Sequence, residues 1–321
     1  MQTRLTSTTK PGASLTRISV ECDEAANEVG ASRAAGATDA APSAAPAKAT
    51  PRKIIQARSG WQAVNLREMW RYRELLFFMV WRDVKIRYKQ TVLGAAWAII
   101  QPVMTMVVFD IFFGRLGGMA KQVEGSYSVF IYAALLPWTF FSVSVNQASM
   151  SLLNNAHLLA KVYFPRLLIP LAAIGGGLVD FAISFGVMLL LMLVSGVGIS
   201  SHFVLLPLFV AGTVLTTLAV AIPMSAVVVA YRDFRYIIAF AVQLWMFASP
   251  VAYPLEVVPA EWRFWYSLNP MVGMISGFRS TLLGETFHWD CIGISLAVTL
   301  VTLVIGAMFF RRVERSLADI I

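Results

Sequence analysis

The stretch VLLPLFVAGTVLTTLAVAIPMSAVVVA, residues 204–230, decides the class of fold. It carries no charged side chain over its whole length. A helix needs about 20 predominantly apolar residues to cross the hydrocarbon core of a bilayer, so this stretch predicts a membrane-spanning helix. Pro207 and Pro223 interrupt its backbone hydrogen bonding, but membrane helices tolerate such breaks where neighbouring groups satisfy the freed carbonyls.

The composition of the whole chain agrees with a lipid-embedded protein. Of its 321 residues, 58% are hydrophobic and 14% are charged, and the mean hydropathy is +0.68. Soluble domains have about 45–50% apolar and about 25% charged residues. We therefore expect an all-α integral membrane protein whose transmembrane domain comprises residues 60–321. Its six predicted spans are 92–113, 129–150, 167–194, 204–230, 236–253 and 291–310.

The net charge of +8 does not indicate a nucleic-acid partner, because the basic residues lie beside the apolar segments. Most of them precede the first span, follow the last, or lie in the connectors between spans two and three and spans four and five. Cytoplasmic connectors of membrane proteins carry an excess of Lys and Arg. Both termini are therefore expected in the cytoplasm.

The first 59 residues differ in composition from the rest of the chain. The stretch ASRAAGATDAAPSAAPAKATP, residues 31–51, has almost no large apolar side chains. Such a segment cannot bury enough surface to offset its chain entropy, so residues 1–59 are expected to be disordered. The two cysteines, Cys22 and Cys291, are far apart and indicate neither a disulfide framework nor a metal site.

Residues 66–90 predict an amphipathic helix in the membrane interface, ahead of the first span. Residues spaced three or four positions apart form one face of this helix, and all of them except Phe78 are charged: Arg67, Arg71, Glu74, Phe78, Arg82, Lys85 and Lys89. One interpretation is an anchor whose basic residues meet anionic lipid, at about 1 kcal/mol each. The other is a basic lip that receives an anionic, lipid-linked substrate.

A second irregular segment, PLEVVPAEWRFWYSLNPMVGMISGFRSTLLG, covers residues 254–284 between the fifth and sixth spans. It has an aromatic cluster followed by an apolar stretch that is too short to cross the membrane. We expect a re-entrant pair of short helices on the outer side, because irregular backbone at membrane depth must be covered by protein or line a cavity. An alternative interpretation assigns the aromatic residues to the interfacial belt.

The sequence shows no catalytic or metal-binding constellation. It contains neither a G-x-x-x-x-G-K-[ST] phosphate loop nor an H-E-x-x-H motif, and its three histidines fall in three different connectors. Two acidic residues lie inside spans: Asp110, within reach of Arg115, and Asp180 near the middle of the third span. A carboxylate at that depth is costly, so it is a candidate functional residue or a hydrogen-bonded contact between helices.

Several motifs together resemble the transmembrane subunit of ABC-2 type exporters, and in particular the branch that exports O-antigen, capsule and teichoic acid. The motifs are MVWRDVKIRYKQTVLGAAWAIIQP (79–102), LLPWTFF (135–141), KVYFPRLLIPL (161–171), YRDFRY (231–236), QLWMFASPVAYP (243–254) and SLNPM (267–271). The resemblance covers about residues 60–320. It implies a permease of the bacterial cytoplasmic (inner) membrane with no ATPase site of its own.

The same resemblance implies the partners of the chain. Members of the family form homodimers, and each copy pairs with a cytoplasmic ABC ATPase, which holds the ATP and Mg²⁺; no cofactor is expected on this chain. The connector between spans two and three is then a coupling helix that contacts the ATPase. Its residues here are Asn154, Asn155, His157, Leu158 and Lys161.

The resemblance also suggests where a lipid-linked glycan could bind. The pyrophosphate of the carrier would meet the basic lip Arg82, Lys85, Arg87 and Lys89. Aromatic rings stack on the apolar faces of sugars, so aromatic residues of spans two and five are candidates for the channel lining. They are Phe130, Tyr132, Trp138, Phe140, Phe141, Trp245, Phe247 and Tyr253.

Three other functions remain open on the sequence alone. The ABC-2 architecture also exports drugs and small lipids, and periodicity cannot decide the cargo. A membrane-embedded transferase or hydrolase of glycan assembly is disfavoured because paired acids and a His motif are missing. A scaffold without transport is disfavoured, more weakly, by the proline breaks and the irregular segment.

Overall fold

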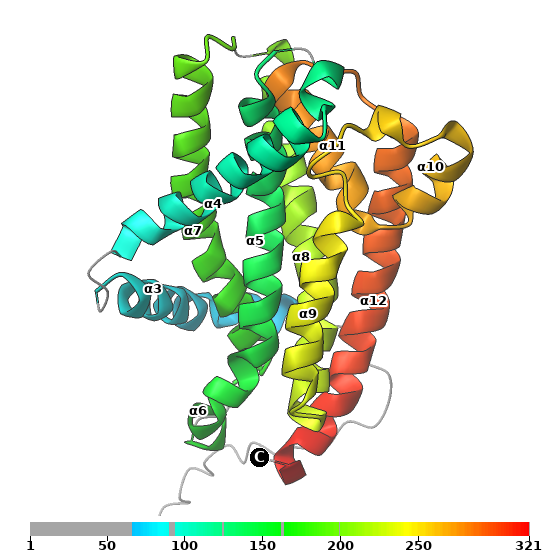
Figure 1. Ribbon diagram of the computed structural model, residues 1–321. Coiled ribbons are helices and arrows are strands. Elements are labelled where there is room, and N and C mark those ends of the chain that lie inside the picture. Colours follow the sequence, from blue (N-terminus) through cyan, green and yellow to red (C-terminus); the bar gives the residue numbers. More distant parts are fainter. Residues whose placement is uncertain (1–65, 90–93, 124, 162–163, 199, 321) are drawn as a thin grey trace, which may run out of the picture. The chain divides into compact units, whose positions relative to one another are not determined.

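A computed structural model describes residues 66–89, 94–123, 125–161, 164–198 and 200–320 (Figure 1). All of them belong to the unit Gly60–Ile321. The segment 1–59, predicted to be disordered, lies outside the described residues, as does the link between the predicted interfacial helix and the first span.

Every regular element among the described residues is helical. The α-helices are α2 (Leu66–Arg71), α3 (Arg73–Lys89), α4 (Gly94–Phe109), α5 (Tyr127–Asn154), α6 (Ala156–Lys161), α7 (Leu168–Val194), α8 (Leu206–Ala230), α9 (Phe234–Phe247), α10 (Ala260–Ser267), α11 (Pro270–Leu283) and α12 (Trp289–Ile320). Shorter turns of other helix types are η1 (Asp110–Leu116), η2 (Met119–Gln122), η3 (Ser201–Leu205) and η4 (Leu255–Val257).

Five helical segments in the described part of the chain are long and apolar enough to cross a membrane. They are Ala96–Leu116, Tyr127–Asn154, Leu168–Val194, Ser201–Ala230 and Trp289–Glu314. They correspond to the first four predicted spans and the sixth. The fifth predicted span, 236–253, contains only the shorter helix α9.

Helix α9 is short for a spanning helix. Its 14 residues rise about 21 Å, against a hydrocarbon core of about 30 Å. It ends at Phe247, three residues before Pro250, which has no amide hydrogen with which to continue the helical ladder. The length of the helix alone therefore does not establish a sixth span.

Helix α5 forms the centre of the bundle. Of its most apolar window, 78% is buried, compared with 17–39% for the other four candidate spans. Its aromatic side chains contact two of its neighbouring helices: Phe140 packs edge-on against Phe181 of α7, and Phe141 against Trp245 of α9. Much of the apolar surface of the other long helices is left exposed and suited to lipid or to another protein.

Helix α3 lies across the long helices α5 and α7 rather than along them (Figure 1). Its inner side is anchored by Met79, which is buried, and by Val80, which packs directly on Gly175 of α7. Its exposed side carries charged residues together with large aromatic ones, among them Phe77 and Trp81. A position in the membrane interface stays a prediction.

Helices α10 and α11 lie at the end of the bundle where α12 begins, opposite the end that carries α6 (Figure 1). Every residue of α11 from Pro270 to Leu282 is buried. Glycines permit this close packing: Gly277 lies against the ring of Phe209 on α8, and Gly273 against the backbone of Ile292 on α12. Helix α11 is thus part of the protein core, whereas its depth in the membrane stays a prediction.

Candidate functional site

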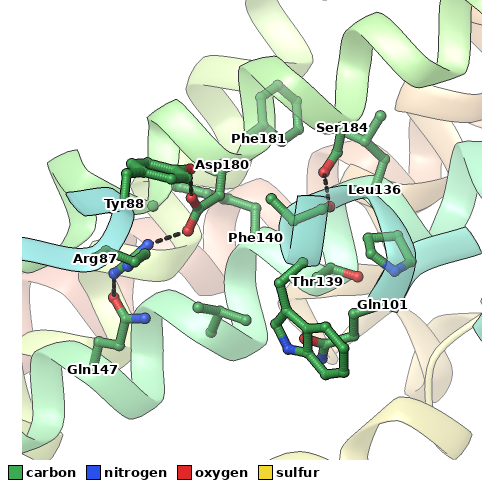
Figure 2. A pocket seen from close by; sticks show the side chains of 15 residues that line it. Arg87, Tyr88, Gln101, Leu136, Thr139, Phe140, Gln147, Asp180, Phe181 and Ser184 are labelled. Atoms are coloured by element: carbon green, nitrogen blue, oxygen red, sulfur yellow. Dashed lines mark hydrogen bonds and ion pairs between the residues drawn. The ribbon is translucent and has the colours of Figure 1, made fainter. Parts of the chain in front are cut away.

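A cavity of about 510 Å³ lies between α3, α4, α5 and α7 (Figure 2). Its volume is within the range of small-molecule and cofactor sites. The lining residues are Arg87, Tyr88, Trp97, Ala98, Gln101, Pro102, Leu136, Thr139, Phe140, Val143, Gln147, Gly177, Asp180, Phe181 and Ser184.

The polar end of this cavity is built around Asp180. Arg87 of α3 forms an ion pair with one carboxylate oxygen of Asp180, and the hydroxyl of Tyr88 donates to the other. The second terminal nitrogen of Arg87 donates to Gln147 Oε1 of α5 at 2.5 Å. Figure 2 shows these four side chains converging from three helices.

Charge compensation explains how Asp180 is accommodated. The side chains of Arg87 and Asp180 are 31% and 23% exposed, so each is largely withdrawn from water and each offsets the other's desolvation. Burial, and next the hydrogen bond to Asp180, raise the pKa of the Tyr88 hydroxyl. Tyr88 therefore remains a proton donor at neutral pH, and the polar end of the cavity carries no net charge.

The rest of the wall combines apolar and neutral polar groups. Trp97, Phe140 and Phe181 present aromatic surface, while Gln101 and Thr139 present hydrogen-bonding groups. Ser184 of α7 donates to the carbonyl of Ala98 at 3.1 Å, which holds α4 against α7 on this side. Such a wall suits an amphiphilic ligand with both apolar and hydroxyl-rich parts.

The four residues of the predicted basic lip fall into two pairs. Arg87 forms the contacts described above, and Arg82 is held by Asp83 at 2.8 Å and by Asn155 at 3.0 Å. Lys85 and Lys89 are exposed and line a shallow surface pocket with Arg82 and Ile86. The two lysines are thus the more accessible groups for an anionic ligand.

The predicted coupling segment comprises the end of α5 and the short helix α6. Asn154, His157 and Lys161 are exposed, while Asn155 and Leu158 are partly buried. Leu158 packs against the apolar cluster around Met79 and Leu152. A short helix exposed at one end of the bundle is a geometry that allows another protein to contact it.

The predicted lining residues are placed very differently. Five of them, all on α5, are almost completely buried within the protomer: Phe130, Tyr132, Trp138, Phe140 and Phe141. Of these, Phe140 borders the cavity. On the α9 side, Phe247 is exposed, Trp245 is partly buried, and Tyr253 shares a 2.9 Å hydrogen bond with Tyr266.

Asp110 pairs with Arg115 at 3.7 Å, as their spacing suggested, but Arg115 is 77% exposed. An exposed pair of this kind adds little stability. Both residues lie in the π-helical turn η1 that follows α4. Nothing else among their described contacts gives Asp110 a functional role.

The sequence did not predict that the guanidinium of Arg279 is buried. Arg279 lies in the predicted outer segment 254–284, where an arginine is expected to be exposed, but it is only 2% exposed, within α11. Its guanidinium carbon lies 4.0 Å above the ring of Phe130, and its Nε lies 3.3 Å from Glu285 Oε2, at ion-pair distance but off the direction of a hydrogen bond. Its Nη1 donates to the carbonyl of Pro250 at 3.4 Å.

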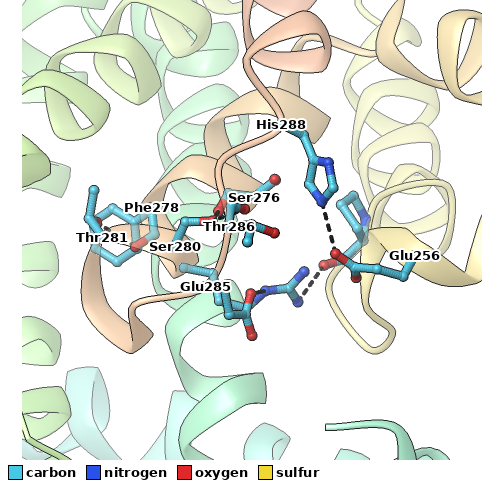
Figure 3. A network of polar contacts seen from close by, with 10 residues as sticks. Glu256, Ser276, Phe278, Ser280, Thr281, Glu285, Thr286 and His288 are labelled. Carbon is cyan, nitrogen blue, oxygen red and sulfur yellow. Dashed lines mark hydrogen bonds and ion pairs between the residues drawn. The ribbon is translucent and has the colours of Figure 1, made fainter. Parts of the chain in front are cut away.

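Two carboxylates beside Arg279 differ in their electrostatics (Figure 3). Burial raises the pKa of Glu285, although Arg279 opposes this. Burial also acts to raise the pKa of Glu256, but the hydrogen bond from His288 at 2.8 Å and nearby positive charge outweigh it, and the pKa is lowered.

In the part of the chain that the structure describes, no group of three or more His, Cys, Asp or Glu side chains is placed to hold a metal ion.

Asn269 joins the same irregular segment to α9. Its side-chain oxygen caps α11 by accepting from the amide of Met271 at 3.0 Å and also accepts from Trp245 Nε1 at 2.9 Å. Its side-chain nitrogen donates to the carbonyl of Ala248 and to Ser249 Oγ, both at 2.9 Å. The motifs QLWMFASPVAYP and SLNPM, separated in sequence, therefore meet at one asparagine.

Comparisons with known proteins agree on one family. The family described as "ABC-2 type transporter" matches residues 74–283, which include the whole cavity, α6 and Asn269. The O-antigen export system permease protein RfbA of Myxococcus xanthus is 32% identical over 217 residues, or 67% of this chain and 82% of that protein.

Two further relatives cover more of the chain. The O-antigen export system permease protein RfbA of Klebsiella pneumoniae is 26% identical over 249 residues, 77% of this chain and 95% of that protein. The polysialic acid transport protein KpsM of Escherichia coli is 25% identical over 268 residues, 81% of this chain and 98% of that protein. On the extent of these matches, the chain belongs to the ABC-2 type transporter family.

Proposed function

We propose that this chain is the transmembrane subunit of an ATP-driven exporter of a lipid-linked polysaccharide, of O-antigen, capsule or teichoic-acid type, across the bacterial cytoplasmic membrane. The observation that carries the proposal is the family match together with relatives named for O-antigen export and polysialic acid transport. The family match, residues 74–283, runs through the cavity, the segment of α6 and the α9–α11 region.

The proposal includes six membrane crossings, with α9 and the residues after it as the fifth. The hydroxyl of Tyr127, at the start of α5, donates to the carbonyl of Ala252 at 2.7 Å. Residue 252 therefore reaches the end of the bundle opposite Asn154, although helix α9 itself stops at Phe247. With an even number of crossings both termini would lie on one side, and the excess of basic residues on that side favours the cytoplasm.

ATP hydrolysis is assigned to a separate subunit. The sequence has no phosphate loop, so ATP and Mg²⁺ would be held by two cytoplasmic ABC ATPase subunits that flank a homodimer of this chain. In this arrangement α6 is the coupling helix, with the exposed Asn154, His157 and Lys161 facing the ATPase and Leu158 anchoring it to the bundle.

We assign the reception of the carrier pyrophosphate to Lys85 and Lys89, because Arg82 and Arg87 already have protein partners. For the channel lining we retain Phe247, Trp245 and Tyr253, since the α5 aromatics are covered by their own protomer. Asp180 is assigned the role of holding Arg87 and Tyr88 at the wall of the cavity.

The test is a strain that lacks this chain, complemented with the wild type or with Asn154, His157 and Lys161 changed together to Ala. We expect the wild type, but not the triple variant, to restore polysaccharide at the cell surface and to retain an ATPase during purification in mild detergent. His202→Ala, a single change near the other end of the bundle, is the matched control and should behave as the wild type. Normal surface polysaccharide in the strain without this chain would contradict the function.

A further inference from the structure

The junction between α5 and α6 is a single residue, Asn155. Its backbone dihedrals, φ −110° and ψ 21°, depart from the helical values and end α5. Its carbonyl accepts from the amides of Leu158 and Leu159, at 3.0 and 3.2 Å, and so begins α6. Any movement of α6 relative to α5 therefore acts on Asn155.

The side chain of Asn155 also connects this junction to α3. Its nitrogen donates to the carbonyl of Ser151 at 2.9 Å, which fixes the orientation of the amide. Its oxygen accepts from Arg82 Nη2 at 3.0 Å. Asp83 holds the same guanidinium through Nε at 3.0 Å and Nη2 at 2.8 Å, so Arg82 is itself preoriented.

Helix α3 continues without a break from Arg82 to Arg87, where it forms the polar end of the cavity. Between its ends, α3 packs closely on α7 through Val80. A Cβ added at Gly175 of α7 would lie only 2.7 Å from Cγ2 of Val80. A hydrogen-bonded helix is stiff over so few residues, so a shift at Arg82 must be accompanied by a shift at Arg87. Arg87 in turn holds Asp180 and Gln147.

We propose that the hydrogen bond between Arg82 and Asn155 transmits movement of α6 through α3 to the cavity, where it changes the contacts of Arg87 with Asp180 and Gln147. This inference rests on the proposed function, in which the ATPase moves α6. It makes Arg82 and Asn155 positioning residues: they act through Arg87 and need not touch the transported molecule.

A competing route runs along α5 itself, because Gln147 and Asn155 belong to the same helix and its cap. The two routes differ in one respect. If α5 alone carries the movement, removing the Arg82 guanidinium leaves the response of the cavity unchanged. If α3 carries it, Arg82 and Asn155 act as one unit and their effects are not additive.

The experiment measures how nucleotide changes the accessibility of the cavity. Thr139, which lines the cavity, is replaced by Cys in a chain with Cys22→Ser and Cys291→Ser, and its rate of maleimide labelling is compared with and without ATP and vanadate. The complete complex with its ATPase is used in proteoliposomes. The cycle comprises Arg82→Ala, Asn155→Ala and the double variant.

We expect nucleotide to change the labelling rate in the parent, and each single substitution to reduce that change about tenfold, the factor expected from a hydrogen bond to a charged group. The double variant should resemble either single variant. Asn155→Asp keeps an oxygen acceptor for Arg82 and should preserve the response. Arg71→Ala removes an exposed charge upstream of α3 and is the matched control.

A nucleotide response that survives Arg82→Ala, or effects that add in the double variant, would overturn the relay while leaving the exporter function intact. Size-exclusion profiles and ATPase retention distinguish these outcomes from misfolding; if Arg82→Ala does not assemble, Arg82→Lys, which keeps the charge without the planar fork, replaces it in the cycle. A parent complex with no ATPase bound would overturn the proposed function, and the relay with it.

Discussion

The guanidinium of Arg87 on α3 is shared between Asp180 on α7 and Gln147 on α5. One crossing helix is thereby tied to two helices of the bundle. The tie also forms the polar end of the cavity, so it contributes both to the stability of the fold and to the shape of the site.

Removal of Asp180 should therefore destabilise the protein. Asp180→Ala leaves Arg87 without its carboxylate, and we expect a loss of about 1–3 kcal/mol, less than for a fully buried pair because both side chains are partly exposed. The thermal midpoint of the detergent-purified protein measures this loss. Arg87→Ala combined with Asp180→Ala should recover part of it; a double variant less stable than both single variants would refute the pairing.

Asn269 should be more important for the α9–α11 arrangement than an ordinary helix cap. Asn269→Ala removes the cap of α11, worth about 1 kcal/mol, and also the contacts with Trp245, Ala248 and Ser249. Asn269→Asp keeps the capping oxygen but loses the two donated bonds. Its protection from hydrogen exchange should therefore lie between that of the wild type and that of Asn269→Ala. Protection of the α9–α11 backbone from hydrogen exchange measures this order, and protection in Asn269→Asp equal to that of the wild type would limit the role of Asn269 to its accepting oxygen.

The helices themselves were largely predictable, because long apolar runs leave few other structures in a membrane. Within the fifth predicted span the helix stops at Phe247, and an apolar run does not reveal that the chain leaves the helix before Pro250. The sequence also could not predict which face of α5 is buried. Lipid-facing and protein-facing side chains are both apolar, so periodicity could not show that Phe130 and Phe141 are covered.

The candidate site was predictable as individual residues but not as a set. Asp180 was recognised as an unusual carboxylate and Arg87 as part of a basic segment, each for a separate reason. Their pairing depends on how α3 crosses α7, and local sequence does not encode that crossing. Arg279 was missed for a similar reason, because its partners Phe130 and Glu285 reach it only through the tertiary packing of α11.

Acidification should weaken the contact between Glu256 and His288. The pKa of Glu256 is lowered in the folded protein, so its stabilising contribution is complete above the unfolded value of about 4.3 and disappears as the pH falls through the lower folded value. The difference in thermal midpoint between wild type and Glu256→Gln should therefore shrink as the pH falls from about 6 to about 3.

The difference in thermal midpoint between wild type and Glu256→Gln reports on Glu256 rather than on the neighbouring charged groups. Arg279 and Glu285 face the same region, and the raised pKa of Glu285 gives its contribution the opposite sign. Glu261→Gln, a change at an exposed carboxylate on α10, is the matched control. A difference for Glu256→Gln that stays constant over this pH range would show that the carboxylate gains nothing from His288.

The packing of α11 against α8 should not tolerate a single added methyl group at Gly277. A Cβ there would overlap the ring of Phe209, which is itself buried, so either the ring or the helix must move. We expect Gly277→Ala to cost about 1–3 kcal/mol, the usual penalty of overpacking, measured as a lower thermal midpoint. Gly293→Ala, on α12 with open space around the new methyl group, should be neutral or slightly stabilising. Phe209→Leu should restore part of the stability of Gly277→Ala by making room; a Gly277→Ala protein as stable as the wild type would show that α11 is not held this tightly against α8.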